Sequence, residues 1–242
     1  MESIVLLERD ENIAIITLNH PEKLNAVSVA MRDALYEQIL AVQADPTIDG
    51  VILRGNGKGF CAGADLKEFG TIPSVIEKRK IRIQHDIWDE FRRCSKPIAA
   101  ILHGFAVGSG IEMAMICDFR FAAPKTKISL PECALGMLPA AGGTQSLPRL
   151  MRHGWAIDFA MKGYYLSAEE AKARQIVTDI FEEEHLFDEV LNFMKRITTY
   201  PKTAQQIKRL ISSGMDRSLE QGLAFEQTLV KESFKQQVIA NG

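Results

Sequence analysis

The sequence is short of the features that would assign it to several common classes of protein. No apolar run approaches the ~20 residues that a membrane-spanning helix needs. The opening Met1-Glu-Ser3 lacks the basic and apolar regions of a signal peptide. Neither sign of charge dominates, because 29 basic and 31 acidic side chains leave a net charge of −2. Nucleic acid and anionic membranes are therefore not expected as partners, and a cytoplasmic location is expected.

Cysteine is also scarce, and its spacing excludes the usual metal and redox motifs. The four cysteines are Cys61, Cys94, Cys117 and Cys133, and no pair of them forms a CxxC or zinc-finger spacing. Three of them lie among apolar or small residues, which indicates reduced core thiols. We find no cluster of metal-ligand residues and no Ser/His/Asp arrangement, so no metal site is expected.

What the sequence does contain is an alternation of short apolar runs and amphipathic segments, which predicts an α/β fold. Strands and helices alternate up to about residue 181, and helices dominate afterwards. We expect strands over 4–7, 12–18, 51–53, 98–102, 119–122, 127–130 and 176–181. We expect helices over 29–44, 74–94, 111–117, 154–162, 167–174, 186–198, 202–213 and 218–237.

Three glycine-rich loops, at 55–63, 104–110 and 139–143, each follow a short strand or extended run. Such loops let a ligand approach the backbone closely, and a helix N-terminus offers N–H groups and partial positive charge. The second loop does not match GxGxxG, because Met113 stands where the third glycine would be, and no P-loop lysine follows. An oxyanion site is the better prediction.

Two acids accompany the second loop. Glu112 lies in the first turn of a helix of Ala, Met and Ile, and Glu132 follows in Leu130-Pro-Glu132. Each has an ordinary alternative, since Glu112 suits a helix N-terminus and Glu132 suits a solvated turn. Together they indicate acid–base chemistry, because two carboxylates in one confined site take unequal pKa values.

At these residues the chain resembles the crotonase superfamily, and within it the enoyl-CoA hydratases. The matching stretches run in the family's order over nearly the whole chain, and the ordered set is far more specific than any single stretch. They are Asn19-His-Pro21, Leu24-Asn-Ala26, Gly59-Phe-Cys-Ala-Gly-Ala-Asp-Leu66, Lys96-Pro-Ile-Ala-Ala-Ile-Leu-His-Gly104, Gly108-Ser-Gly-Ile-Glu-Met-Ala-Met-Ile-Cys-Asp118, Pro131-Glu-Cys-Ala-Leu-Gly136, Pro139-Ala-Ala-Gly-Gly-Thr-Gln145 and Leu166-Ser-Ala-Glu-Glu-Ala171.

The resemblance implies a spiral of ββα turns over residues 1–195 and a helical trimerisation region over 196–242. It implies an acyl-CoA substrate, with the thioester oxygen held by the backbone N–H groups of Ala64 and Ser109. Many relatives have glycine where Ser109 stands. The glutamate pair favours hydration, with Glu112 activating water and Glu132 delivering the proton, although a coupled pair can share both roles.

The resemblance also suggests residues that contact the substrate or its CoA. Lys58 and Lys67 match positions that often meet the CoA phosphates, although exposed loop lysines explain them equally well. Ala140 stands where many hydratases have glycine. The full set of expected substrate and CoA contacts is Lys23, Ala26, Lys58, Ala62, Asp65, Leu66, Lys67, Gly108 and Ala140.

The expected function is thus reversible addition of water across the 2,3 double bond of a 2-enoyl-CoA. No cofactor is expected, because the CoA is part of the substrate, and the expected assembly is a homotrimer or a dimer of trimers. Two alternatives stay open. One is an enoyl-CoA isomerase, or a specialised crotonase acting on a branched or carboxylated acyl-CoA. The other is a non-catalytic RNA-binding or scaffold relative.

Overall fold

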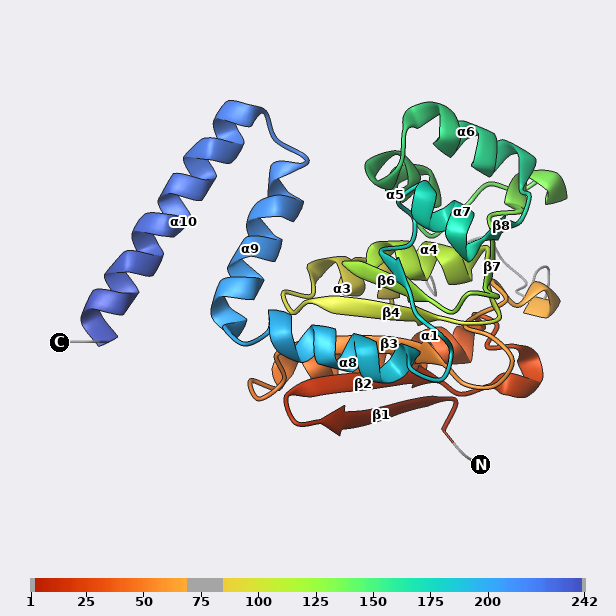
Figure 1. The fold of residues 1–242 in the computed structure, drawn as a ribbon, viewed down its shortest axis with the longest axis horizontal. Helices are drawn as coiled ribbons and strands as arrows, with labels where there is room; N and C mark the ends of the chain where they lie inside the picture. Colours follow the sequence, from red (N-terminus) through yellow and green to blue (C-terminus); the bar gives the residue numbers. More distant parts are fainter. Residues whose placement is uncertain (1–2, 69–84, 241–242) are drawn as a thin grey trace.

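The computed structural model describes residues 3–68 and 85–240, with side chains up to residue 234. Its centre is a sheet of six strands in the order β1-β2-β3-β4-β6-β9 (Figure 1). The strands are β1 (Val5–Asp10), β2 (Ile13–Leu18), β3 (Gly50–Gly55), β4 (Ile98–Leu102), β6 (Phe119–Ala122) and β9 (Asp179–Ile180). β1 and β2 form an antiparallel hairpin, and every other pairing in this sheet is parallel. The carboxyl ends of the parallel strands therefore meet at one edge, where ligands bind in many α/β folds.

The central strands are mostly apolar, as is typical of a sheet that is covered on both faces. All residues of β2 and β4 are buried. Helix α8 (Leu186–Ile197) packs on one face through an apolar cluster that includes Val190 and Met194. Helices α1 (Val29–Ala44), α3 (Ile87–Arg93) and α4 (Ser109–Ile116) contribute to the larger core cluster on the other face.

The chain also forms a smaller sheet of three strands, whose first strand lies within the second glycine-rich loop. It consists of β5 (Phe105–Val107), β7 (Lys127–Ser129) and β8 (Leu166–Ser167), with β5 parallel to β7 and β7 antiparallel to β8. The remaining short elements are the 3-10 turns η1 (Pro21–Lys23), η2 (Leu66–Glu68) and η3 (Glu132–Leu135), and the helices α5 (Gly143–Leu150), α6 (His153–Lys162) and α7 (Ala168–Ala173).

Buried cations close the ends of two core helices. The Lys96 Nζ donates hydrogen bonds to the carbonyls of Val42 and Asp45, at the end of α1. The Arg120 guanidinium donates to the carbonyl of Cys117, which caps α4, and to that of Ile176. A cation at a helix C-terminus satisfies carbonyls that have no partner within the helix. The position of α4 is thereby tied to β6 and to the segment before β9.

Two helices, α9 (Pro201–Gly214) and α10 (Leu219–Ala240), extend away from the sheet as a helical hairpin (Figure 1). Lys208 connects α9 to the core, because its Nζ lies 2.7 Å from Asp118 Oδ2 and donates to the carbonyl of Lys96 at 2.9 Å. The division of the chain at residues 195 and 196 stays a prediction.

The expected α/β fold with a helical C-terminal region is confirmed, and most expected elements lie within one to three residues of the observed ones. The expectation of one continuous helix over 74–94 is wrong in its described part, because Asp86 caps a new helix by accepting a hydrogen bond from the Asp89 amide. The rest of that segment lies outside the described residues. Strand β5 was not expected, because its three residues lie between glycines.

One buried asparagine holds the first glycine-rich loop in place. Asn25 is 0% exposed and lies in the left-handed region at φ 54°. Its Nδ2 donates to the carbonyls of Asn56, Gly59 and Phe60 at 2.9, 3.1 and 3.1 Å, and its Oδ1 accepts from the His20 amide at 2.9 Å. One side chain therefore joins the turn after β2 to the loop after β3.

We predict that Asn25→Ala lowers the free energy of unfolding by about 2–4 kcal/mol, because it leaves buried carbonyls without a donor. Denaturant titration followed by circular dichroism measures the change. Asn192→Ala, at an exposed position of α8, is the matched control and should change stability by less than about 0.5 kcal/mol. Equal effects of the two substitutions would contradict the role given to Asn25.

Candidate active site

The first two glycine-rich loops lie side by side because backbone hydrogen bonds join them. Val107 donates to the Cys61 carbonyl at 3.0 Å, and the Phe60 amide donates to the Phe105 carbonyl at 3.0 Å. The approach is close enough to require glycine: a Cβ on Gly63 would lie 2.9 Å from the Val107 carbonyl oxygen, at φ +99°. A Cβ on Gly108, at φ +53°, would lie 2.7 Å from Glu132 Oε1. The residues that follow these two glycines are thus brought together.

Those following residues are Ala64 and Ser109, the two expected oxyanion donors. Both line one cavity of about 410 Å³. Neither backbone N–H donates a hydrogen bond to any acceptor within residues 3–68 and 85–240. For Ser109 this follows from its position as the first residue of α4, where no earlier carbonyl is available. Amides that are left free at a cavity wall are suited to an oxyanion.

Glu112 is buried, with only 1% of its surface exposed. Its Oε1 accepts hydrogen bonds from the amides of Ala141 at 3.0 Å and Gly143 at 2.7 Å. The third glycine-rich loop therefore binds this carboxylate through its backbone, and a Cβ on Gly143 would lie 2.8 Å from the same oxygen. Buried carboxylates need such donors. Glu112 is not among the residues that line the cavity.

Glu132, by contrast, lines the cavity directly. Its Oε2 is buried and has no hydrogen-bond partner within the described part of the chain. Burial raises the pKa of this carboxyl above its usual value, its own backbone N–H partly offsets the rise, and the negative charge of Glu112 raises it further. The charge of Glu112 therefore acts on Glu132, although the two carboxyl groups have different surroundings. A carboxyl with a raised pKa is suited to holding and delivering a proton.

The other expected contacts divide into two groups. Ala62, Leu66, Gly108 and Ala140 line the cavity. Lys23, Ala26, Lys58, Asp65 and Lys67 do not, but they lie in the segments around it: the Ala62 amide donates to the Leu24 carbonyl, and the Ala26 amide to that of Lys23. The Asp65 carboxylate accepts from the Lys67 amide at 3.0 Å, the local turn bond of an Asx motif. Lys23, Lys58 and Lys67 are exposed.

Several lining residues were not expected from the sequence. They are Gly63, Val107, Pro131, Leu135, Met137 and Leu138. Leu135 and Leu138 are exposed although they are large and apolar. The apolar Leu-Gly-Met-Leu run that begins three residues after Glu132 could have suggested an apolar wall of a binding site. Helix α5 begins after Gly142, its N-cap in the left-handed region, and the first amide of the helix, that of Gly143, donates to Glu112.

The other side chains that could take part in catalysis are two cysteines and a histidine, and each has a structural role instead. The thiols of Cys61 and Cys117 are buried, and burial raises the pKa of each to about 12, so neither is a nucleophile at neutral pH. His103 interacts through Nε2 with the Gly57 carbonyl at 3.0 Å, a contact that holds the first glycine-rich loop. Within residues 3–68 and 85–240 no group of His, Cys, Asp and Glu side chains is arranged to hold a metal ion.

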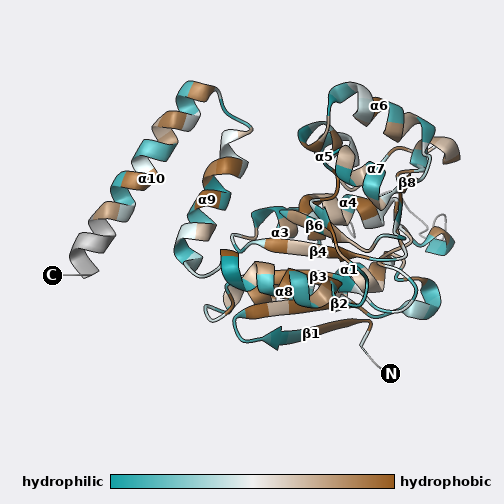
Figure 2. Ribbon diagram, in the orientation of Figure 1, coloured by the Kyte–Doolittle hydropathy of each residue, from teal (hydrophilic) through white to brown (hydrophobic). Residues whose placement is uncertain are grey.

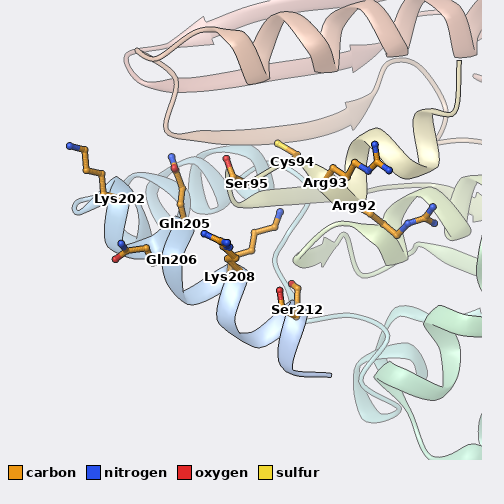
Figure 3. A pocket seen from close by; sticks show the side chains of 11 residues that line it. Arg92, Arg93, Cys94, Ser95, Lys202, Gln205, Gln206, Lys208 and Ser212 are labelled. Carbon is orange, nitrogen blue, oxygen red and sulfur yellow. The ribbon is translucent and has the colours of Figure 1, made fainter. Parts of the chain in front are cut away.

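A second cavity, of about 470 Å³, lies between α3 and α9 and is lined by polar and basic side chains (Figure 3). Its cations are largely engaged elsewhere: Arg92 and Arg93 pair with Asp89, and Lys208 pairs with Asp118. In Figure 3 the two arginines point away from α9. No carboxylate lines this cavity, so it offers no acid–base pair, and the first cavity is the candidate active site.

Known proteins share this fold and define the family of the chain. The family model described as enoyl-CoA hydratase/isomerase matches residues 8–242. The chain belongs to this family, within the crotonase superfamily. A mitochondrial enoyl-CoA hydratase of Pongo abelii is 31% identical over 96% of this chain and 81% of its own length. A crotonyl-CoA hydratase of Syntrophomonas wolfei is 31% identical over 92% of this chain and 86% of its own length.

Solved structures show the same fold. An enoyl-CoA hydratase of Mycobacterium smegmatis superposes with a TM-score of 0.90 at 28% identity, over 96% of this chain and 91% of the other. One from Thermoplasma volcanium superposes with a TM-score of 0.89 at 31% identity, over 97% and 93%. The crotonase fold expected from the sequence is thus confirmed. The relatives' names support an enzyme of the hydro-lyase kind.

No helix in the described ranges has the length and apolarity needed to cross a membrane.

We predict that Glu132→Gln stabilises the protein at neutral pH. The folded state binds the Glu132 proton more tightly than the unfolded state does, because the pKa is raised on folding. Stability therefore falls as pH rises from the ordinary glutamate value of 4.5 through the raised folded value. Glutamine removes this loss, so Tm at pH 7 should rise by about 1–3 °C and the gain should disappear below about pH 4.

Thermal unfolding measured from pH 4 to pH 8 tests this expectation. Glu183→Gln, in the exposed turn before α8, serves as the control. A lower Tm for Glu132→Gln at pH 7 would show that the charged form of Glu132 is favoured by the fold.

Proposed function

We propose that this protein is a 2-enoyl-CoA hydratase that adds water across the 2,3 double bond of an acyl-CoA thioester. The observation that carries the proposal is the meeting of two backbone amides and a carboxyl group with a raised pKa at one cavity. Two unused backbone amides, of Ala64 and Ser109, line it. Glu132 also lines it, and the charge of Glu112 contributes to the raised pKa of Glu132. The names of the family and of its relatives support the same reaction class.

The cavity suggests how the substrate lies. The thioester oxygen accepts hydrogen bonds from the Ala64 and Ser109 amides, which stabilise the negative charge that develops there. The acyl carbons lie against the apolar side of the cavity, formed by Val107, Leu135 and Met137. No lysine, arginine or histidine lines the cavity among the described residues. This lining suits an uncharged acyl group better than a carboxylated one.

The two carboxyl groups then divide the chemistry. The Glu112 carboxylate takes a proton from water as the water oxygen bonds to C3. The C2–C3 π electrons move toward the thioester, and its oxygen becomes an enolate oxygen. The protonated form of Glu132, which the raised pKa favours, delivers its proton to C2, and the carbonyl reforms. Transfer of the proton from Glu112 back to Glu132 through solvent restores the resting state.

We propose that the CoA portion of the substrate lies outside the cavity. It would contact the segments that contain Lys23, Ala26, Lys58, Asp65 and Lys67. Three of these residues are exposed lysines, whose charge suits phosphate groups. The substrate supplies the CoA, and the proposed reaction needs no further cofactor. The cytoplasmic location expected from the sequence remains a prediction.

We predict that Glu112→Gln lowers kcat for hydration of crotonyl-CoA by about 10²–10⁴-fold, because the general base is removed while the shape is kept. Glu132→Gln should cause a loss of similar size. Disappearance of the conjugated thioester absorbance measures the rate. Glu183→Gln is again the control. If Glu112→Gln hydrates crotonyl-CoA at the wild-type rate, water addition does not use this pair.

An enoyl-CoA isomerase is the second candidate, and one observation favours it: Glu132 lines the cavity whereas Glu112 does not. An isomerase needs one carboxylate, which would take a proton from C2 of a 3-enoyl-CoA and return it to C4. The same variants separate the two reactions. In an isomerase, Glu112→Gln retains conversion of 3-enoyl-CoA to 2-enoyl-CoA, and Glu132→Gln loses it.

We also propose that α9 and α10 join copies of this chain into a trimer or a dimer of trimers. These helices carry large apolar residues that are exposed, as the brown segments in Figure 2 indicate. They are Ile207, Ile211, Leu219, Leu223, Val230 and Phe234, and the exposed Met215 follows directly after α9. An exposed apolar surface of this extent is typical of an interface between chains.

Sedimentation equilibrium should give the mass of three or six chains. Leu223→Asp places a charge in the proposed interface and should shift the population toward monomers at micromolar concentration. Gln221→Asp, at an exposed position two residues before Leu223 on α10, adds the same charge outside the apolar row and should leave the mass unchanged. A monomeric wild-type protein would contradict the proposed assembly.

A further inference from the structure

The side chain of Ser109 is a feature that the proposed reaction does not yet use. The proposed function assigns only its backbone N–H, a role that glycine fills in many relatives. Yet Ser109 is among the residues that line the cavity, and it is partly exposed there. A hydroxyl at this place adds both a hydrogen-bond donor and bulk to the proposed oxyanion site.

The direction of the side chain follows from its place in the helix. Ser109 is the first residue of α4, after Gly108 as N-cap. Cα–Cβ bonds in a helix tilt toward its N-terminus, which is also the direction in which the first amides point. The hydroxyl and the amide of Ser109 therefore face the same side, three bonds apart, and both can reach one acceptor atom.

The hydroxyl is also unused by the protein. Buried hydroxyls elsewhere in the chain have partners: Ser129 donates to the Gly163 carbonyl at 2.9 Å, and Thr126 donates to the Leu102 carbonyl at 3.1 Å. The Ser109 hydroxyl makes no hydrogen bond to any residue in the ranges 3–68 and 85–240. Glu132 is close, since its Oε1 lies 2.7 Å from where a Cβ on Gly108 would stand, but Ser109 is not bonded to it.

We propose that the Ser109 hydroxyl is a third donor to the thioester oxygen, beside the amides of Ala64 and Ser109. The inference rests on the proposed function, because it assumes that the thioester oxygen lies at these amides. No covalent bond changes at Ser109: its O–H donates a hydrogen bond that strengthens as the carbonyl oxygen becomes an enolate oxygen. Because the gain is larger in the transition state than in the ground state, it raises kcat more than it lowers KM.

The rival explanation is that the serine side chain only crowds the site. Two substitutions separate these explanations, since Ser109→Ala removes the hydroxyl and Ser109→Gly removes the hydroxyl and the Cβ. If the hydroxyl donates, both variants lose about 10- to 100-fold in kcat for crotonyl-CoA hydration, with KM changed less than about threefold. If it only crowds, Ser109→Gly equals or exceeds the wild type.

A second reaction tests the inference without water addition. In D₂O the Glu132 carboxylate can take an α-proton from butyryl-CoA, pass through the same enolate, and return a deuteron. Mass spectrometry of butyryl-CoA measures the exchange, and both Ser109 variants should slow it by the same factor as hydration. Ser213→Ala on α9, away from the cavity lining, is the control for both assays and should match the wild type. Thermal unfolding confirms that each variant is folded.

These two assays distinguish a failure of the Ser109 inference from a failure of the hydratase proposal. A wild-type protein that exchanges butyryl-CoA but hydrates no enoyl-CoA would refute the hydratase proposal and leave the exchange test of Ser109 intact. A wild-type protein that hydrates crotonyl-CoA while Ser109→Ala keeps full kcat and full exchange would refute the inference alone. A wild-type protein without either activity would refute both.

Discussion

The site depends on the backbone pairing between the loop after β3 and strand β5. The bonds from Val107 to Cys61 and from Phe60 to Phe105 hold the two segments at strand-like distance. They place Gly63 against Val107 so closely that no side chain fits between them. The amides of Ala64 and Ser109, which lie far apart along the chain, reach the same cavity through this pairing. A donor pair built from backbone is already oriented before any ligand arrives, which is the condition for effective stabilisation of a developing charge.

A second constraint is electrostatic. The protein buries the Glu112 carboxylate and binds it with the amides of Ala141 and Gly143, so the charged form is stabilised by the third glycine-rich loop. Glu132 has an exposed side at the cavity and a buried oxygen without such donors. Burial and the neighbouring charge therefore raise its pKa. Unequal environments for two carboxylates are how one site supplies both a base and an acid.

These two constraints meet in α4. Its first residue supplies an amide to the cavity, its fourth residue is Glu112, and its end is closed by Arg120 through the Cys117 carbonyl. The same region receives Lys208 of α9 at Asp118, so the helical hairpin that we propose as the interface is tied to the helix that carries the site. Movement of α4 would displace a proposed donor and a proposed base together.

Much of the fold could be predicted from the sequence, since apolar runs such as Ile98–Leu102 form buried strands and Ser28 begins a helix as an N-cap should. The elements that were missed have local reasons. Strand β5 is three residues between glycines, and its identity comes from partners distant in sequence, Lys127–Ser129 and Cys61. Asp86 interrupts a helical pattern because a cap competes with continuation.

The sequence by itself determined the order of strands and helices, the glycine positions and the presence of two candidate acids, because these depend on local propensity and on motifs that are continuous in the chain. Only the tertiary structure decided that Glu132 lines the cavity while Glu112 does not, and that Leu135 and Met137 line it. The physical reason is that burial, pKa and exposure to a cavity are set by packing between segments that are distant in sequence. The local pattern of residues in the sequence does not show how such distant segments pack.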